Sequence, residues 1–160
     1  MTGAAAGMSA LLPSFSLAAT GKKKYEAMVL SCIDPRLQEP VHSYTRRRHL
    51  AGKYSQFVIA AGAAVGVVAE PFKDWHKAWW DNVAASVDLH SIKKVIAINH
   101  RDCGAAKIAY GEAGVANWKA ETATHKAALA QFREQMKERL PKLGVETGLM
   151  ALNGRIEMFA

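Results

Sequence analysis

Three short apolar runs along the chain predict buried β-strands. Residues 27–33 (Ala-Met-Val-Leu-Ser-Cys-Ile) show no helical face and end at Asp34-Pro35, which is typical of a parallel strand followed by a turn. Residues 56–62 form a second run that leads into small residues, and residues 92–99 form a third. Because Asp34 can cap a helix and Pro35 suits its first position, we expect a short helix after the first strand.

Elsewhere in the chain, apolar residues recur with the spacing of an α-helix. After Asp74, apolar residues recur every four positions and predict a helix that packs them in the core: Trp75, Trp79, Val83 and Val87. A second, long helix is expected over 122–140 and ends at Pro141. Residues 148–159 predict a strand, an Asn-Gly turn and a return strand.

The alternation of strands and helices predicts an α/β fold with a mostly parallel central sheet, flanked by helices, and a C-terminal edge hairpin. Ligands of such sheets bind at the carboxyl ends of the strands. Cys32 lies near the end of the first strand, while His100 and Cys103 follow the third. These three residues are therefore expected to meet at one edge of the sheet.

Length, composition and charge limit the number of domains and the kinds of partner. A chain of 160 residues suits one domain, and its net charge of +7 is carried partly by two basic runs, Lys22–Lys24 and Arg46–Arg48. Neither run has interleaved aromatic residues, so we interpret both as solvated or subunit-contact surfaces and expect no nucleic-acid partner. No stretch is long and apolar enough to predict a membrane span.

The N-terminal segment is expected to stand apart from the folded domain. Residues 1–24 contain an apolar stretch with small residues and resemble either a helical arm or the remnant of a Tat-type export signal. The first alternative suits a cytoplasmic protein and the second a periplasmic one. Residues 25–160 are expected to form a single folded domain.

The residue types at the predicted sheet edge point to zinc chemistry. Zinc prefers thiolate and imidazole ligands, and a catalytic site supplies three of them while leaving the fourth position open. Cys32, His100 and Cys103 make such a set. Asp34 and Arg36 lie beside it, where a carboxylate could ligate the metal or accept a hydrogen bond from water, and the guanidinium could orient that carboxylate.

The combined pattern of Cys-x-Asp-x-Arg followed by His-x-x-Cys-Gly resembles the β-class carbonic anhydrases. The resemblance covers roughly residues 26–110, and the terminal hairpin is similar to the last strands of that family. It implies one zinc ion per chain, bound by Cys32, His100 and Cys103, and homodimers or higher homo-oligomers. It further implies that Asp34 and Arg36 are a catalytic dyad that orients a zinc-bound hydroxide for the reversible hydration of carbon dioxide to bicarbonate. In the closed form of the family the aspartate, here Asp34, binds zinc itself.

One departure from the family leaves the substrate open. Where many members have Arg-Asn-Ala-Gly-Asn, this chain has Ile59-Ala-Ala-Gly-Ala63, so polar groups are replaced by methyl groups. A more apolar pocket would suit carbonyl sulfide or carbon disulfide as the substrate of a related zinc hydrolase. A third alternative is a catalytically inactive zinc-binding or disulfide-bridged interaction module on the same scaffold. The sequence singles out no histidine as a proton shuttle.

Overall fold

A five-stranded sheet forms the centre of the computed structural model, which describes residues 24–61 and 63–160. Its strands run in the order β2-β1-β3-β4-β5. The first four are parallel and β5 is antiparallel to β4, so the predicted mostly parallel sheet with a C-terminal edge hairpin is confirmed. The strand bounds are β1 (Ala27–Cys32), β2 (Tyr54–Ile59), β3 (Lys94–His100), β4 (Gly144–Met150) and β5 (Ile156–Phe159).

The apolar runs form strands, but their burial depends on the position of each strand in the sheet. Every residue of β1 is buried, because β1 has a neighbour on each side and helices on both faces. The prediction that residues 56–62 form a buried strand is wrong in two respects. The strand ends at Ile59, and it lies at the edge of the sheet, where Gln56 and Val58 are exposed.

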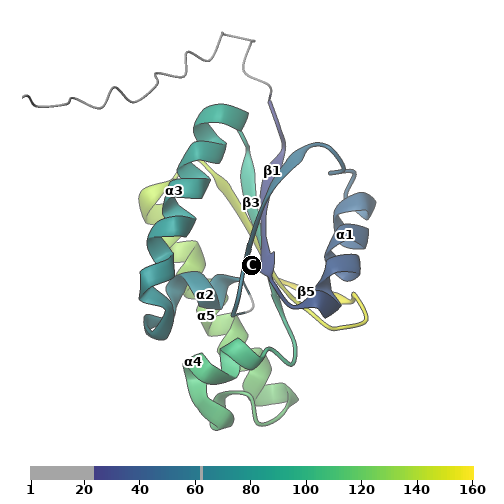
Figure 1. The fold of residues 1–160 in the computed structure, drawn as a ribbon, viewed down its shortest axis with the longest axis vertical. Coiled ribbons are helices and arrows are strands. Elements are labelled where there is room, and N and C mark those ends of the chain that lie inside the picture. The colour runs from purple at the N-terminus through teal and green to yellow at the C-terminus, as the bar shows by residue number, and fades with distance from the viewer. Residues whose placement is uncertain (1–23, 62) are drawn as a thin grey trace, which may run out of the picture.

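Helices cover both faces of the sheet (Figure 1). One face carries α1 (Gln38–Arg47), and the opposite face carries α2 (Ala64–Val68), α3 (Lys73–His90) and α5 (Trp118–Arg139). The helix α4 (Gly104–Gly114) lies at the carboxyl edge of the sheet, and two single 3₁₀ turns are present, η1 (Pro35–Leu37) and η2 (Glu70–Phe72). The core therefore has two halves, one centred on Trp79 and Phe132 and the other on Val41 and Ile96.

The two predicted long helices are present, with differences at their N-terminal ends. Trp79 and Val83 are buried in the core, as predicted, whereas the expectation that Trp75 packs inside is wrong, since it is 38% exposed and stacks on Phe72. The helix expected over 122–140 begins earlier, at Trp118. Asn117 caps it, because its side-chain oxygen accepts a hydrogen bond from the Ala120 amide at 3.0 Å.

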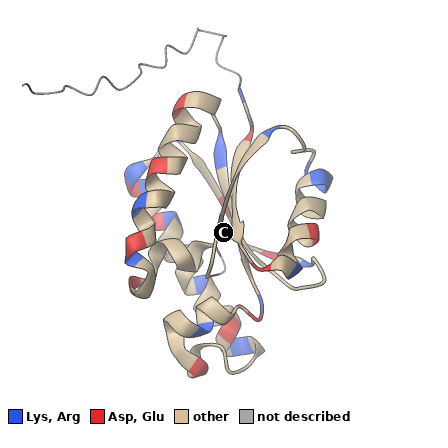
Figure 2. Ribbon diagram, in the orientation of Figure 1, with Lys and Arg blue, Asp and Glu red and all other residues tan. Residues whose placement is uncertain are grey.

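Charged residues lie mainly on the outer sides of the helices, with basic and acidic positions interspersed along α3 (Figure 2). At the end of α1, Arg46 and Arg47 are exposed, whereas Arg48 pairs with Glu146 at 2.9 Å. The expected arm or export signal over residues 1–24 lies almost wholly outside the described residues. Within the described ranges, no helix combines the length and apolar character needed to cross a membrane.

Candidate metal centre

Cys32, His100 and Cys103 meet at the carboxyl edge of the sheet. Cys32 is the last residue of β1, His100 is the last residue of β3, and Cys103 directly precedes α4. Because β1 and β3 are parallel neighbours, their carboxyl ends are adjacent. The potential ligand atoms of the three buried residues all lie within 4.8 Å of one another. That spacing suits a tetrahedral ion, whose ligands lie about 2.0–2.3 Å from the metal.

The imidazole of His100 is oriented for metal binding. Its Nδ1 lies 2.8 Å from the backbone oxygen of Arg101, and a carbonyl oxygen only accepts hydrogen bonds, so Nδ1 carries the proton. The lone pair is therefore on Nε2. This atom is fully buried and has no hydrogen-bond partner among the described residues. Since buried polar atoms are rarely left unpaired, the orphaned Nε2 fits a missing metal ion.

The two cysteines fit the same ion. No disulfide joins them in the described part of the chain. The hydrogen bond with Cys32, together with burial, raises the pKa of Cys103 and favours its neutral thiol. Two adjacent sulfurs ionise together only when a cation compensates their charge, and zinc supplies that compensation in proteins. Two sulfurs and one imidazole are a donor set that suits zinc.

Asp34 and Arg36 form a bidentate ion pair next to the cluster. Asp34 caps the turn η1 by accepting the Arg36 amide at 2.9 Å, and its Oδ2 lies 2.7 Å from Arg36 Nη2. The hydrogen bond from the Arg36 side chain lowers the pKa of Asp34 to about 2. The aspartate is therefore ionised at neutral pH, and the structure shows it paired with arginine rather than grouped with the three potential ligands.

Arg36 has a second carboxylate partner that sequence reasoning missed. Its Nη1 lies 2.7 Å from Asp102 Oδ2, and its Nη2 donates to the Asp102 backbone oxygen at 3.1 Å. Asp102 stands between the potential ligands His100 and Cys103. The guanidinium thus joins the turn after β1 to the turn after β3. The sequence shows an Asp directly before Cys103, but it does not show how close this residue lies to Arg36 in the fold.

A cavity of about 460 Å³ opens beside the cluster. Cys32, Asp34, Arg36 and Cys103 line one part of it, and the methyl groups of three alanines line another: Ala60, Ala61 and Ala105. The structure therefore places part of the expected methyl-rich segment at the cavity wall. Little room is left behind this wall, since a Cβ atom added at Gly66 of α2 would clash with the Ala60 carbonyl oxygen.

A buried polar pair anchors the first residue of α2, a few positions after the alanines of the wall. Asn99 Oδ1 accepts the Ala64 amide at 2.8 Å, and Asn99 Nδ2 lies 3.1 Å from His125 Nδ1. Burial lowers the pKa of His125 to about 4, so this imidazole is neutral at pH 7. Neither Asn99 nor His125 was predicted to have a role at the site, because a single polar residue inside an apolar run carries no such signal.

The fold and this cluster together define a class of α/β protein with a Cys-His-Cys cluster that could hold a metal ion at the carboxyl edge of a parallel sheet. Residues 22–148 match the family model described as "Putative carbonic anhydrase", and the chain belongs to that family. Two relatives described as uncharacterized come from Rickettsia. The one from Rickettsia conorii is 32% identical over 130 residues, covering 81% of this chain and 69% of the relative. The one from Rickettsia bellii is 34% identical over 130 residues, covering 81% and 79%.

Solved structures with the same fold are β-carbonic anhydrases. An enzyme of Aspergillus fumigatus matches with a TM-score of 0.56 and 17% identity over 86% of this chain and 76% of its own. The Coccomyxa enzyme in complex with acetazolamide matches with a TM-score of 0.57 and 15% identity over 91% and 76%. A tetrameric enzyme of Sordaria macrospora matches with a TM-score of 0.51 and 15% identity over 86% and 82%. At these identities the likeness establishes the β-carbonic anhydrase fold.

Proposed function

We propose that this protein catalyses the reversible hydration of carbon dioxide to bicarbonate at one zinc ion held by Cys32, His100 and Cys103. The observation that carries the proposal is the buried, unpartnered Nε2 of His100, which lies with two sulfurs beside an ionised Asp34. When bound, zinc lowers the pKa of water at such a site to about 7 and so supplies a nucleophile near neutral pH.

Asp34 and Arg36 have distinct roles in this proposal. An ionised carboxylate only accepts hydrogen bonds, so Asp34 takes one from the attacking water and aims its lone pair at the substrate carbon. Arg36 holds Asp34 in place through its bidentate pairing. The same pairing would keep Asp34 from serving as a ligand, so Cys32, His100 and Cys103 would hold the zinc and the fourth position would be available to water.

The alanine wall suits a small apolar substrate. Ala60, Ala61 and Ala105 offer neither donors nor acceptors beyond the backbone, so carbon dioxide meets little competition from hydrogen-bonded water along them. Bicarbonate gains no side-chain hydrogen bond from the same wall. Weak retention of the charged product favours its release.

The experiment is a stopped-flow hydration assay at about pH 7 to 9 with zinc content measured on the same sample. We expect a rate that disappears when a chelator strips the metal and returns when zinc is added back. Protein with one zinc per chain and a rate equal to that of buffer alone would refute carbon dioxide hydration.

Hydrolysis of carbonyl sulfide or carbon disulfide is the second candidate, and the alanine wall is the observation that favours it. Sulfur accepts hydrogen bonds poorly, so these substrates lose little hydrogen-bonding free energy when they leave water for a wall of methyl groups. A more polar substrate loses more. Sulfide release by the zinc-loaded protein distinguishes the two reactions. A zinc-loaded protein that hydrates carbon dioxide and releases no sulfide excludes the second candidate, and one that does neither is a zinc-binding module.

We also propose that the protein forms a homodimer or a higher homo-oligomer. The Sordaria macrospora neighbour is described as tetrameric. In this chain β2 is an edge strand, and Val58 on it is 45% exposed, which leaves apolar and backbone groups available to a second copy. Light scattering of the full chain tests this, and a mass equal to one chain across the micromolar range would refute it.

A further inference from the structure

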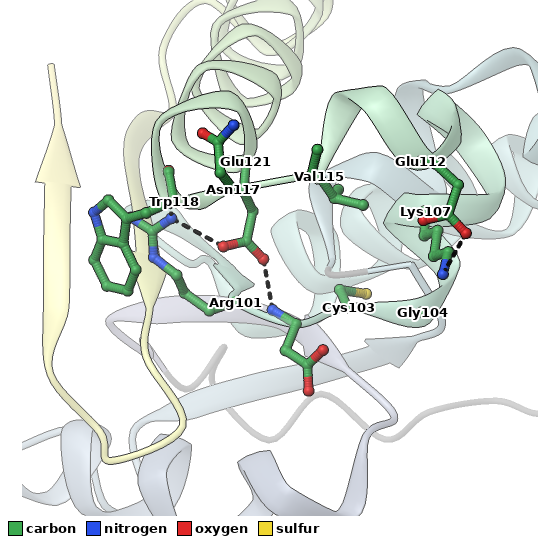
Figure 3. Close-up of a pocket in the computed structure, with 11 residues that line it drawn as sticks. Arg101, Cys103, Gly104, Lys107, Glu112, Val115, Asn117, Trp118 and Glu121 are labelled. Carbon is green, nitrogen blue, oxygen red and sulfur yellow. Dashed lines mark hydrogen bonds and ion pairs between the residues drawn. The ribbon is translucent and has the colours of Figure 1, made fainter.

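Glu121, in the first turn of α5, contacts the turn that carries two of the potential metal ligands. The residue is only 8% exposed, and both of its carboxylate oxygens are used. Oε1 accepts the backbone amide of Asp102 at 2.6 Å, and Oε2 lies 3.0 Å from Arg101 Nη1. Figure 3 shows the carboxylate between the Arg101 guanidinium and that backbone nitrogen.

The turn that Glu121 contacts has a backbone conformation that needs support. Asp102 has φ = 57°, in the left-handed region that non-glycine residues adopt only where local contacts stabilise it. His100 precedes this residue by two positions and Cys103 follows it directly. A change at Asp102 would therefore alter the separation between the imidazole and the sulfur. The short hydrogen bond from its amide to Glu121 is the contact that holds this conformation from the α5 side.

Arg101 strengthens the same attachment. Its buried guanidinium donates to Glu121, to the Trp118 backbone oxygen at 3.2 Å and to Thr122 Oγ1 at 2.7 Å. The Trp118 ring covers it, with the guanidinium carbon 3.4 Å from the ring centroid. A buried ion pair that is also hydrogen-bonded is sensitive to the loss of either partner. The first turn of α5 and the metal-binding turn are thus joined by a charge pair and several hydrogen bonds.

The attachment extends to the Asp34–Arg36 dyad through Asp102. Glu121 holds the amide of Asp102, while Arg36 binds the carbonyl oxygen and the carboxylate of the same residue. We propose that Glu121 is a positioning residue, which holds the Arg101–Asp102 turn so that Cys103 meets the metal and Arg36 meets Asp34. This inference rests on the metal centre of the proposed function and is independent of which substrate is hydrated.

The test compares Glu121→Gln and Glu121→Ala with Glu112→Gln in the full chain. Glu112 is a matched control. Like Glu121, it lines a second cavity, of about 470 Å³, but it pairs with Lys107 and its side chain is 80% exposed. Zinc affinity is measured by competition with a chelator, and the geometry of the site is followed by the absorption of the cobalt-substituted protein. Thermal unfolding is recorded in parallel, so that zinc affinity is compared only between proteins that are folded.

We expect Glu121→Ala to weaken zinc binding by about 10–100-fold, as for other residues that orient metal ligands, and to shift the cobalt spectrum. Glu121→Gln keeps an oxygen for the Asp102 amide, so it should recover part of the affinity. Glu112→Gln should match the wild type in both measurements.

A purely structural role for Glu121 predicts a different result. In that case the melting temperature falls while the folded protein keeps its zinc affinity and cobalt spectrum, and this outcome overturns the proposal. If Glu121→Ala does not fold, Glu121→Gln decides the question against the same control. If the wild type itself fails to bind zinc, the proposed function has failed instead.

Discussion

The turns after β1 and β3 build a polar wall of the metal cavity, whereas the turn after β2 builds an apolar one. On the polar side, Arg36 donates hydrogen bonds to both Asp34 and Asp102, and Glu121 accepts one from the Asp102 amide. On the apolar side, Ala60 and Ala61 present methyl groups. Under the proposed function, the polar wall would position the ligands and water, while the apolar wall would select the substrate. Orientation and selection would then depend on different strands of one sheet edge.

His100→Gln should have the largest effect, because it removes the ligand on which the polar wall is centred. The glutamine lacks a nitrogen lone pair at the position of Nε2, so we expect zinc retained after dialysis to fall from about one ion per chain to almost none. Metal analysis by plasma emission checks this. His42→Gln is the matched control, since the side chain of His42 is 58% exposed on α1, and equal zinc loss in both variants would contradict the assignment.

Asp34→Asn should abolish most activity while leaving the metal in place. Asparagine can still cap the turn η1, so the local fold is retained, but its amide cannot serve as a charged acceptor for the attacking water. We expect kcat/KM for hydration to fall by about 10²–10⁴-fold at unchanged zinc content. Asp88→Asn, on the exposed side of α3, serves as the control. A loss of zinc that parallels the loss of rate would show that Asp34 acts as a ligand instead.

The sheet, and the meeting of the three potential ligands at its edge, were predictable because both depend on local patterns. The apolar run over 27–33 contains Cys32 near its end, and the run over 92–99 directly precedes His100. Both residues therefore lie at the same edge once the strands are known to be parallel. Glu121 could not be found in this way. A glutamate in the first turn of a helix is a common exposed residue, and only the packing of α5 against the turn after β3 buries it.

Two other features, the edge position of β2 and the helix α4, were also not predicted from the sequence. The order of the strands places β2 at the edge, and the sequence of a strand does not state which neighbours it will have. The helix α4 was missed because its weakly amphipathic sequence includes Gly111, which has a positive φ of 74° inside it.

Asn99→Ala should destabilise the attachment of α2 to β3, close to the apolar wall. It leaves the Ala64 amide and the His125 imidazole without their buried partner, which costs about 3 kcal/mol in the free energy of unfolding and roughly 6–12 °C in Tm. Scanning calorimetry of the zinc-loaded protein measures the change. Asn82→Ala is the control, because Asn82 is exposed on α3 and bonds only within its own helix. A similar Tm for both variants would show that the hydrogen bonds of Asn99 do not stabilise this attachment.

Ala60→Ser should have the smallest effect and addresses selection directly. The added hydroxyl gives the apolar wall a donor for an anion, and one neutral hydrogen bond is worth about 0.5–1.5 kcal/mol. Bicarbonate should therefore bind about two- to tenfold more tightly, which can be followed by titrating the cobalt-substituted protein spectroscopically. Ala84→Ser, on the exposed side of α3, controls for the substitution itself. If Ala60→Ser leaves bicarbonate affinity unchanged, the methyl groups do not set the polarity of the cavity, and the difference between the two walls does not govern substrate choice.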